Sequence, residues 1–154
     1  MIRLLVVSDS HGGCYTLARV LDKHPEAAYV LHLGDGASDM EELLPNCRTT
    51  VYQVSGNCDF CAAQPAEQEL RIGGVPILMT HGHGYGVKHG LGRLEAEARR
   101  RGIRLALFGH THEPVSRYED GLYLVNPGSL RFGSSYAVID ITDNGIAVNL
   151  THIY

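Results

Sequence analysis

The chain has 154 residues, 44% of them hydrophobic, and its 13 Lys and Arg against 17 Asp and Glu give a formal net charge of -4. This length suits one hydrophobic core, so we expect a single domain over residues 1–154. The acidic balance, with no general basic run, argues against nucleic acid as a partner. No apolar run approaches the roughly 18 residues of a membrane span, and the first apolar run turns polar too early for a secretory signal. We therefore expect a cytoplasmic protein without a membrane partner.

The first part of the chain alternates strands with helices. Short apolar runs predict strands at residues 4–7, 29–33 and 51–54. A helix with Leu17, Val20 and Leu21 on one face follows the first strand and closes at Pro25. Residues 38–41 have the pattern of a capping box and open a short helix after the second strand. This βαβαβ order predicts a parallel sheet with right-handed crossovers.

The second part of the chain is dominated by hairpins. Gly73-Gly74 joins strands predicted at 69–72 and 75–79, and further hairpins turn at Asp120-Gly121 and Asn144-Gly145. Between them we expect a helix at 87–101. The remaining strands are predicted at 105–108, 115–118, 122–125, 136–141 and 146–153. A parallel half then meets an antiparallel half, and we predict a mixed α/β (α+β) fold, an αββα sandwich of two packed mixed β-sheets flanked by helices.

Five of the predicted strands are each followed, within a few residues, by side chains that can bind a metal. These side chains are Asp9, His11, Asp35, Asn57, His81, His110 and His112. The carboxyl ends of strands line the ligand crevice of α/β sheets, so residues far apart in sequence can converge there. Each motif also contains a glycine, which permits sharp turns and close backbone approach. We therefore predict a metal site at the C-terminal ends of the strands.

Seven N and O donors exceed the needs of one cation and suit two, with Asp35 as the carboxylate that bridges them. Imidazole, carboxylate and amide donors favour Mn²⁺, with Ni²⁺, Zn²⁺, Fe or Mg²⁺ as alternatives. Two cations about 3.5–4 Å apart can clamp a phosphate, hold the attacking hydroxide between them and stabilise an in-line displacement. The expected reaction is hydrolysis of a small phosphoester.

The ligand motifs resemble those of the calcineurin-like metallophosphoesterase superfamily over nearly the whole chain. They are Asp9-Ser10-His11, Gly34-Asp35, Gly56-Asn57, Thr80-His81-Gly82-His83 and Gly109-His110-Thr111-His112. Asn126-Pro127-Gly128-Ser129 further resembles the small bacterial and archaeal phosphodiesterases of that superfamily. The resemblance implies a phosphodiester substrate. It also implies one metal held by Asp9, His11, Asp35 and His112, and a second held by Asp35, Asn57, His81 and His110.

The catalytic candidates are Asp35, Asn57 and His83. Many members of the superfamily carry a His directly after the Asn ligand, resembling a general acid, whereas this chain has Cys58 there. The small-phosphodiesterase subfamily also tends to have Cys followed by Asp at this point. Protonation of the leaving group then falls to His83 or to a water on the metal, or matters little for an acidic leaving group. His83 is equally well interpreted as a loop histidine oriented by its neighbours.

Several alternatives stay open at this stage. A retromer subunit resembles this fold and works by binding partners, so a metal-poor scaffold is one alternative, and a phosphomonoesterase or a nuclease is another. Exposed strand edges make a homodimer conceivable. We interpret His32 as a hydrogen-bonded core or supporting residue, and Asn126 as either an orienting group or a turn residue. Arg131 can meet a phosphate oxygen or remain a solvated loop cation.

Two further sequence features bear on redox chemistry and specificity. Cys58 and Cys61 have the spacing of a redox or zinc pair, but no second Cys pair accompanies them, and we expect reduced thiols. Substrate specificity is expected to come from the loops at 60–67, 84–90 and 130–135.

Overall fold

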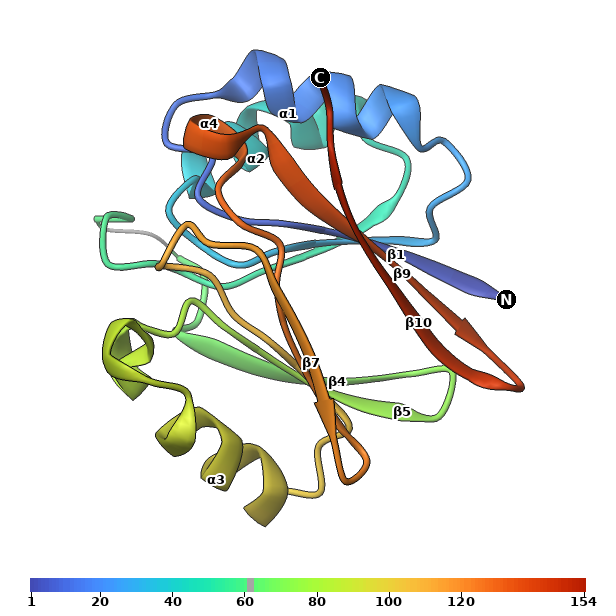
Figure 1. Cartoon of the computed structure of the whole chain (residues 1–154). Coiled ribbons are helices and arrows are strands. Elements are labelled where there is room, and N and C mark those ends of the chain that lie inside the picture. Colours follow the sequence, from blue (N-terminus) through green and yellow to red (C-terminus); the bar gives the residue numbers. More distant parts are fainter. Residues whose placement is uncertain (61–62) are drawn as a thin grey trace.

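Two five-stranded sheets pack against each other in the computed structural model, which describes residues 1–60 and 63–154 (Figure 1). The first sheet has the order β10 (Gly145–His152), β9 (Ser135–Thr142), β1 (Ile2–Val7), β2 (Tyr29–His32) and β3 (Thr50–Gln53). The second has the order β4 (Glu67–Ile72), β5 (Val75–Thr80), β6 (Leu105–Leu107), β8 (Leu122–Asn126) and β7 (Val115–Glu119). The predicted fold class, two packed mixed sheets flanked by helices, is confirmed.

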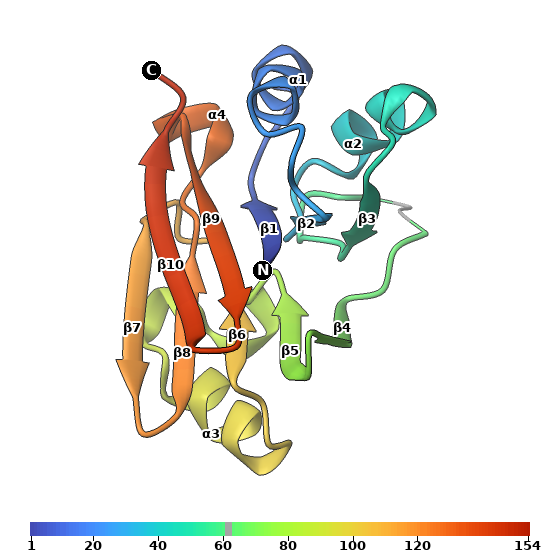
Figure 2. The same cartoon turned by 90° about the vertical axis from the view of Figure 1, so that its right-hand side faces the viewer.

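The first sheet contains both parallel and antiparallel pairs. β1, β2 and β3 run parallel, while β9 pairs antiparallel with both β1 and β10. The expected division into a parallel half and an antiparallel half is therefore wrong, because the C-terminal hairpin joins the N-terminal sheet (Figure 2). The hairpin covers an edge of β1 that would otherwise leave its backbone groups unpaired. Helices α1 (Cys14–Lys23) and α2 (Ala37–Leu43) are the crossovers, and η1 (Leu44–Asn46) follows α2.

The second sheet has a parallel centre and antiparallel edges. β5, β6 and β8 run parallel, and β4 and β7 flank them. Helix α3 (Gly92–Arg100) packs against the outer face through Leu94 and Ala98. The predicted helix at 87–101 is wrong in its first part, which forms η3 (Val87–His89) after η2 (His83–Tyr85). The chain breaks at Gly90, whose φ of 140° lies outside helical geometry.

Two smaller predictions also need correction. The capping box at 38–41 is wrong, since α2 begins at Ala37 with Gly36 as its N-cap residue, and Ser38 lies inside the helix. Residues 130–135, expected to be a loop, contain the short helix α4 (Leu130–Gly133), whose N-cap Ser129 accepts a hydrogen bond from the N–H of Phe132.

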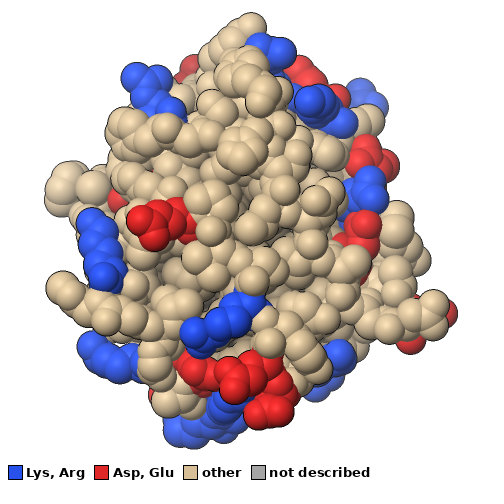
Figure 3. Space-filling model, in the orientation of Figure 1, with Lys and Arg blue, Asp and Glu red and all other residues tan. Residues whose placement is uncertain are grey.

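The lengths of the helices and the charges on one face of the molecule bear on the expected partners. None of the helices in residues 1–60 and 63–154 is long and apolar enough to cross a bilayer. On the face that Figure 3 shows, Lys and Arg are interspersed with Asp and Glu. This mixed distribution does not form the basic stripe that tracks a phosphate backbone on that face.

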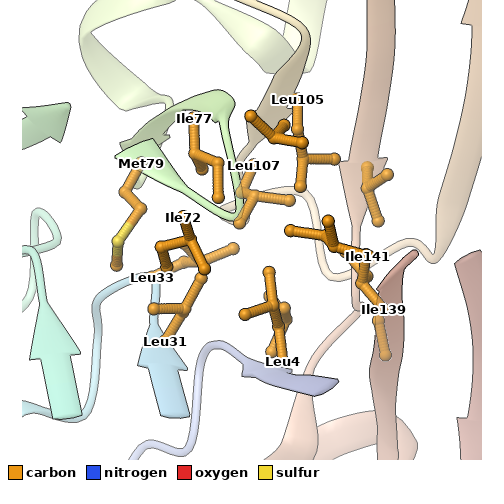
Figure 4. Packing of buried hydrophobic residues seen from close by; sticks show 14 of the residues in the cluster. Leu4, Leu31, Leu33, Ile72, Ile77, Met79, Leu105, Leu107, Ile139 and Ile141 are labelled. Atoms are coloured by element: carbon orange, nitrogen blue, oxygen red, sulfur yellow. The ribbon is translucent and has the colours of Figure 1, made fainter. Parts of the chain in front are cut away.

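The main core lies between the two sheets and follows the alternation of side chains along each strand. Leu4 and Leu31 point from the first sheet toward Ile77 and Leu107 of the second, and Met79 packs nearer the ends of the strands (Figure 4). The alternate residues of β1 and β2 face the opposite way and pack against α1 and α2. Sheets buried on both faces in this way hold the strand ends in fixed relative positions.

Arg3 ties the start of β1 to two acidic residues. Its guanidinium donates to Asp140 at 2.8 and 2.9 Å and to Glu26 at 2.9 Å. Hydrogen bonding to Arg3 lowers the pKa of Glu26 to about 2. The pKa of Asp140 is also lowered, chiefly by its hydrogen bond from Arg3. A carboxyl whose pKa is lower in the folded than in the unfolded chain stabilises the fold above its unfolded pKa and loses this contribution as the pH falls through the folded value.

We therefore expect the stability difference between wild type and Arg3→Met to be largest near neutral pH and to shrink between about pH 4.5 and 2. Urea unfolding at pH 6, 4 and 2.5 measures it. The effect should be modest because the ion pairs are partly exposed. Arg93→Met, at an exposed Arg for which the described part of the chain shows no ion pair, serves as the control. A difference that stays constant over this pH range would contradict the assignment.

Candidate metal centre

The predicted ligands occupy tight loops directly after the strands. Among the residues that the structure describes, seven non-glycine residues have positive φ, and five of these are predicted metal ligands, with φ between 40° and 71°. They are Asp9, His11, Asp35, His110 and His112. Side chains with a Cβ seldom adopt this backbone region, and its clustering is typical of functional sites. The loops are therefore held in a costly conformation by their surroundings.

Two glycines allow these loops to approach one another closely. A Cβ on Gly56 would lie 2.1 Å from Oδ1 of Asp35, and one on Gly109 would lie 2.1 Å from Oγ of Ser8. The loop after β3 thus touches the loop after β2, and the loop after β6 touches the loop after β1. Larger residues at either position would push the loops apart.

Six of the seven predicted ligands form two adjoining groups of side chains. One group is Asp9, His11 and His112, and the other is Asp35, His81 and His110. In the first group, Oδ1 of Asp9 lies 3.4 Å from Nε2 of His11 and 3.2 Å from Nε2 of His112. Side chains that are separated by more than one hundred positions in the sequence thus lie close together in the fold.

Asp35 lies between the two groups. Its Oδ2 is 3.2 Å from Nε2 of His81 in one group and 3.6 Å from Nε2 of His11 in the other. The facing nitrogens of His81 and His110, Nε2 and Nδ1, are 3.2 Å apart. One carboxylate oxygen therefore faces imidazoles of both groups, as a bridging ligand must.

The spacing of these atoms suits metal coordination. Ligands held about 2.1 Å from one cation are separated by about 3.0–3.4 Å, and the distances above are close to this range. Oδ1 of Asp9 and Nε2 of His11 are buried and have no hydrogen-bond partner among the residues that the structure describes. Buried polar atoms normally have partners, so these two orphaned atoms indicate a place for a cation.

Neighbouring groups fix how the ligands are oriented. Nδ1 of His81 lies 2.8 Å from the carbonyl oxygen of Leu33, so this nitrogen carries the proton and Nε2 is left free to bind a cation. Oδ2 of Asp9 accepts hydrogen bonds from Ser8 Oγ and from the N–H of His110, which leaves Oδ1 directed to the site. In both side chains, the hydrogen-bonded atom fixes the orientation and the other atom, His81 Nε2 or Asp9 Oδ1, faces the site.

Electrostatics couple Asp35 and His81. Burial on its own raises the pKa of Asp35, but the adjacent imidazole of His81 and the hydrogen bond from the N–H of Cys58 outweigh it and hold that pKa well below its usual range. Burial likewise lowers the pKa of His81, and the neighbouring carboxylates overcome it so that the pKa is raised. Asp35 is thus kept ionised, as a ligand must be.

Asn57 and Cys58 lie in the loop after β3. The N–H of Cys58 donates to Oδ1 of Asp35 at 2.8 Å, whereas the exposed side chain of Asn57 donates its amide to the Cys58 sulfur at 3.6 Å. The thiol of Cys58 is grouped with His11 and Asp35. Asn57 is thus next to the cluster, with its amide turned to Cys58. Its predicted role as a ligand and catalytic group stays a prediction.

His83 lies beside the second group. Its ring centroid is 5.5 Å from that of His81 and 6.0 Å from that of His110. Partial burial and the charge of His81 lower its pKa. The side chain remains exposed, so it can reach solvent or a substrate from the edge of the cluster.

Asp59 has a structural role that the sequence did not reveal. Its Oδ2 accepts from the N–H groups of Asp35 and Gly56 at 2.7 and 2.8 Å, and its Oδ1 accepts from those of Gly36 and Ala37 at 2.9 and 3.0 Å. Four backbone donors on one carboxylate join the two loops and supply the cap that Gly36 cannot provide for α2. The sequence signal for Asp59 was its place in the Cys-Asp pair that follows Asn57.

A second buried network supports the loop after β1. The N–H of Gly34 donates to Nδ1 of His32, so Nε2 carries the proton and donates to Ser10 Oγ at 3.0 Å. Ser10 in turn donates to Asp39 Oδ2 at 2.6 Å, which also accepts from Gly12. The expected supporting role of His32 agrees with this network, while the contribution of Asp39 was missed.

The remaining candidates lie outside the two ligand groups. Asn126 is buried and donates to the carbonyl of Gly109 and to Thr111 Oγ1, so it orients the loop after β6. Arg131 is exposed on α4. Cys61 lies outside the described residues, so the spacing of Cys58 and Cys61 noted in the sequence is not tested.

A sequence model of the calcineurin-like phosphoesterase superfamily domain matches residues 2–144 of the chain. The chain belongs to this superfamily. It is similar to a probable metallophosphoesterase of Bacillus subtilis, YsnB, with 33% identity over 96% of this chain and 89% of the relative. It is also similar to the phosphodiesterase YfcE of Escherichia coli K12, with 27% identity over 95% and 90% of the two chains. The superfamily and its named relatives make the chain a phosphoester hydrolase whose residue clusters can hold metal ions.

Solved structures agree with this assignment. A predicted phosphoesterase from Streptococcus pneumoniae TIGR4 superposes with a TM-score of 0.83 at 28% identity, over 98% of this chain and 89% of that one. Vacuolar protein sorting 29 from Cryptosporidium parvum superposes with a TM-score of 0.74 at 22% identity, over 97% of this chain and 96% of that one. The second likeness shows the fold alone.

Proposed function

We propose that the protein is a dinuclear metal-dependent phosphodiesterase. The observation that carries this proposal is Oδ2 of Asp35, which faces imidazoles of both ligand groups. When bound, two divalent cations would supply Lewis acidity that neutralises a phosphate and activates water for in-line displacement. The donor set has no obligatory thiolate, which favours Mn²⁺ over softer metals.

The protein's own residues prepare the site for this chemistry. Asp9, His11 and His112 would hold the first cation together with Asp35, and Asp35, His81, His110 and Asn57 would hold the second. The hydrogen bond from Nδ1 of His81 to the Leu33 carbonyl fixes the ring with Nε2 directed inward. His83, at the edge of the cluster, is positioned to give a proton to a leaving oxygen. The backbone donors on Asp59 hold the loops so that little rearrangement is needed on binding.

A diester is the substrate class that we favour. The relative from Escherichia coli is named a phosphodiesterase, and the chain spans 90% of its length. We expect a small ester rather than DNA, since the net charge is -4 and basic residues are interspersed with acidic ones on the face in Figure 3. We also place the protein in the cytoplasm. A homodimer stays a prediction from the sequence.

To test this proposal, metal is removed from the purified protein with a chelator and divalent cations are added back. Wild type and the His81→Ala variant are compared. We expect Mn²⁺ to restore hydrolysis of bis(p-nitrophenyl) phosphate well above that of p-nitrophenyl phosphate, with two equivalents bound. His81→Ala should bind less metal and lose at least about a hundredfold in rate. His89→Ala, at an exposed histidine outside the cluster, is the matched control and should behave as wild type. Two bound metals without hydrolysis would favour a scaffold of the same fold, and a lack of metal binding would overturn the proposal.

A further inference from the structure

Phe132 is an exposed aromatic side chain beside the candidate metal centre. It is 68% exposed, although an aromatic ring loses favourable burial by facing water. Its ring centroid lies 5.3 Å from that of His112, with the planes 28° apart, and 5.4 Å from that of His11. The ring therefore stacks on one predicted metal ligand and touches another, while most of its surface stays open.

The backbone around Phe132 is fixed to the metal loop. The N–H of Leu130 donates to the carbonyl of Ser8, and that of Arg131 to the carbonyl of Asp9, at 3.0 and 3.2 Å. Ser129 also donates through its hydroxyl to the Asp9 carbonyl at 2.9 Å and accepts from the N–H of Phe132. Helix α4 is thus attached to the loop that carries Asp9. The position of Phe132 relative to the cluster is set by these bonds rather than by the ring's own packing.

We propose that Phe132 forms a subsite that stacks a planar aromatic group of the phosphodiester, such as an aryl ring or a nucleobase. This inference rests on the proposed function and names the substrate class more closely. One face of the ring is taken by His112, whose Nε2 points to Asp9 within the cluster. A group carried by a phosphate at the cations would extend along the open side of the same stack. Aromatic rings gain stabilisation from offset stacking beyond the apolar area that they bury.

A different role for Phe132 would be to orient His11 and His112 only. The two roles predict different results. An orienting residue would change metal affinity and the rate for every ester alike, whereas a stacking subsite would affect only esters with a planar group. Leu is the informative substitution, because it retains apolar bulk and removes the aromatic face.

The experiment compares three diesters that share an ethyl group and whose other ester group is methyl, phenyl or thymidine, so that only the last two carry a planar group; chromatography follows the products. For Phe132→Leu we expect KM to rise about tenfold for the phenyl or the thymidine ester, or for both, with little change for the methyl ester. Which of the two responds tells whether an aryl group or a nucleoside is preferred. Metal content should equal that of wild type. Tyr118→Leu, which replaces another exposed aromatic residue on β7, is the matched control.

Product binding gives a readout that does not depend on turnover. Calorimetry with the Mn²⁺-loaded protein should show that Phe132→Leu weakens phenyl phosphate or thymidine 5′-phosphate about tenfold and leaves methyl phosphate unchanged. Equal losses for all ligands, or no loss for any, would overturn the stacking subsite. Failure of wild type to hydrolyse any of the three diesters would count against the proposed phosphodiesterase instead, and the binding comparison would still decide the role of Phe132.

Discussion

Replacing Asp35 by Asn should reduce bound metal to one equivalent or less and lower phosphodiester hydrolysis by at least about a hundredfold. Asn has nearly the same shape, but it removes the negative charge that faces His11 and His81. Its carboxamide also presents only one oxygen, whereas Oδ1 of Asp35 already accepts from the N–H of Cys58. The variant cannot both keep this bond and bridge two cations.

Metal content by mass spectrometry and hydrolysis of bis(p-nitrophenyl) phosphate, measured on one preparation, test this result. Asp143→Asn removes a charge from an exposed turn between β9 and β10 and should leave both measurements unchanged. Asp35→Asn protein that retains two equivalents and wild-type activity would show that Asp35 does not bridge. Loss of activity with both metals retained would assign Asp35 a role in the reaction but not in metal binding.

The position of the candidate ligand cluster could be predicted because its signals are local. Each ligand follows an apolar run that ends at a glycine-containing turn, and strand ends in such folds meet at one edge. Asp9 and Asp35 were found in this way, and the structure places them as expected. The left-handed backbone of both residues is a consequence of the same tight turns.

The errors arose where distant parts of the chain compete with local preference. Residues 38–41 have the sequence of a capping box, yet α2 begins earlier because Asp59 caps it from another loop. The strands of the C-terminal hairpin were predicted around the turn at Asn144-Gly145, but a turn signal does not tell which sheet receives them. β1 accepts β9 on its free edge, and no local pattern encodes that pairing.

Phe132 and Asp39 illustrate the same difficulty for function. In sequence, Phe132 is an ordinary apolar residue of a loop. Its place beside the ligand cluster is set by the hydrogen bonds that fix α4 to the Asp9 loop. Asp39 was assigned to a helix start, whereas it is buried and accepts from Ser10 and Gly12. Supporting residues of this kind are recognised by their partners rather than by their own positions.

Asp59→Asn is the second substitution with a large expected effect, and its consequences should differ from those of Asp35→Asn. The carboxylate accepts four backbone N–H bonds from the loops after β2 and β3. An Asn amide retains one accepting oxygen, and its NH₂ group would face two N–H donors. We expect a loss of about 2–4 kcal/mol in the free energy of unfolding of the metal-free protein, because hydrogen bonds to a charged group are worth more than neutral ones.

The same substitution should weaken metal binding without abolishing it. Asp59 holds the loops that carry Asp35 and Asn57 but lies outside the predicted ligand set, and loss of such supports costs about 10–100-fold in affinity. Excess Mn²⁺ should therefore restore most of the activity of Asp59→Asn, whereas Asp35→Asn should stay inactive at any metal concentration. Urea unfolding and Mn²⁺ titration of hydrolysis, with Asp143→Asn as control, provide the measurements. Unchanged stability together with a defect that excess Mn²⁺ cannot rescue would mean that Asp59 itself takes part in binding the cation or the substrate.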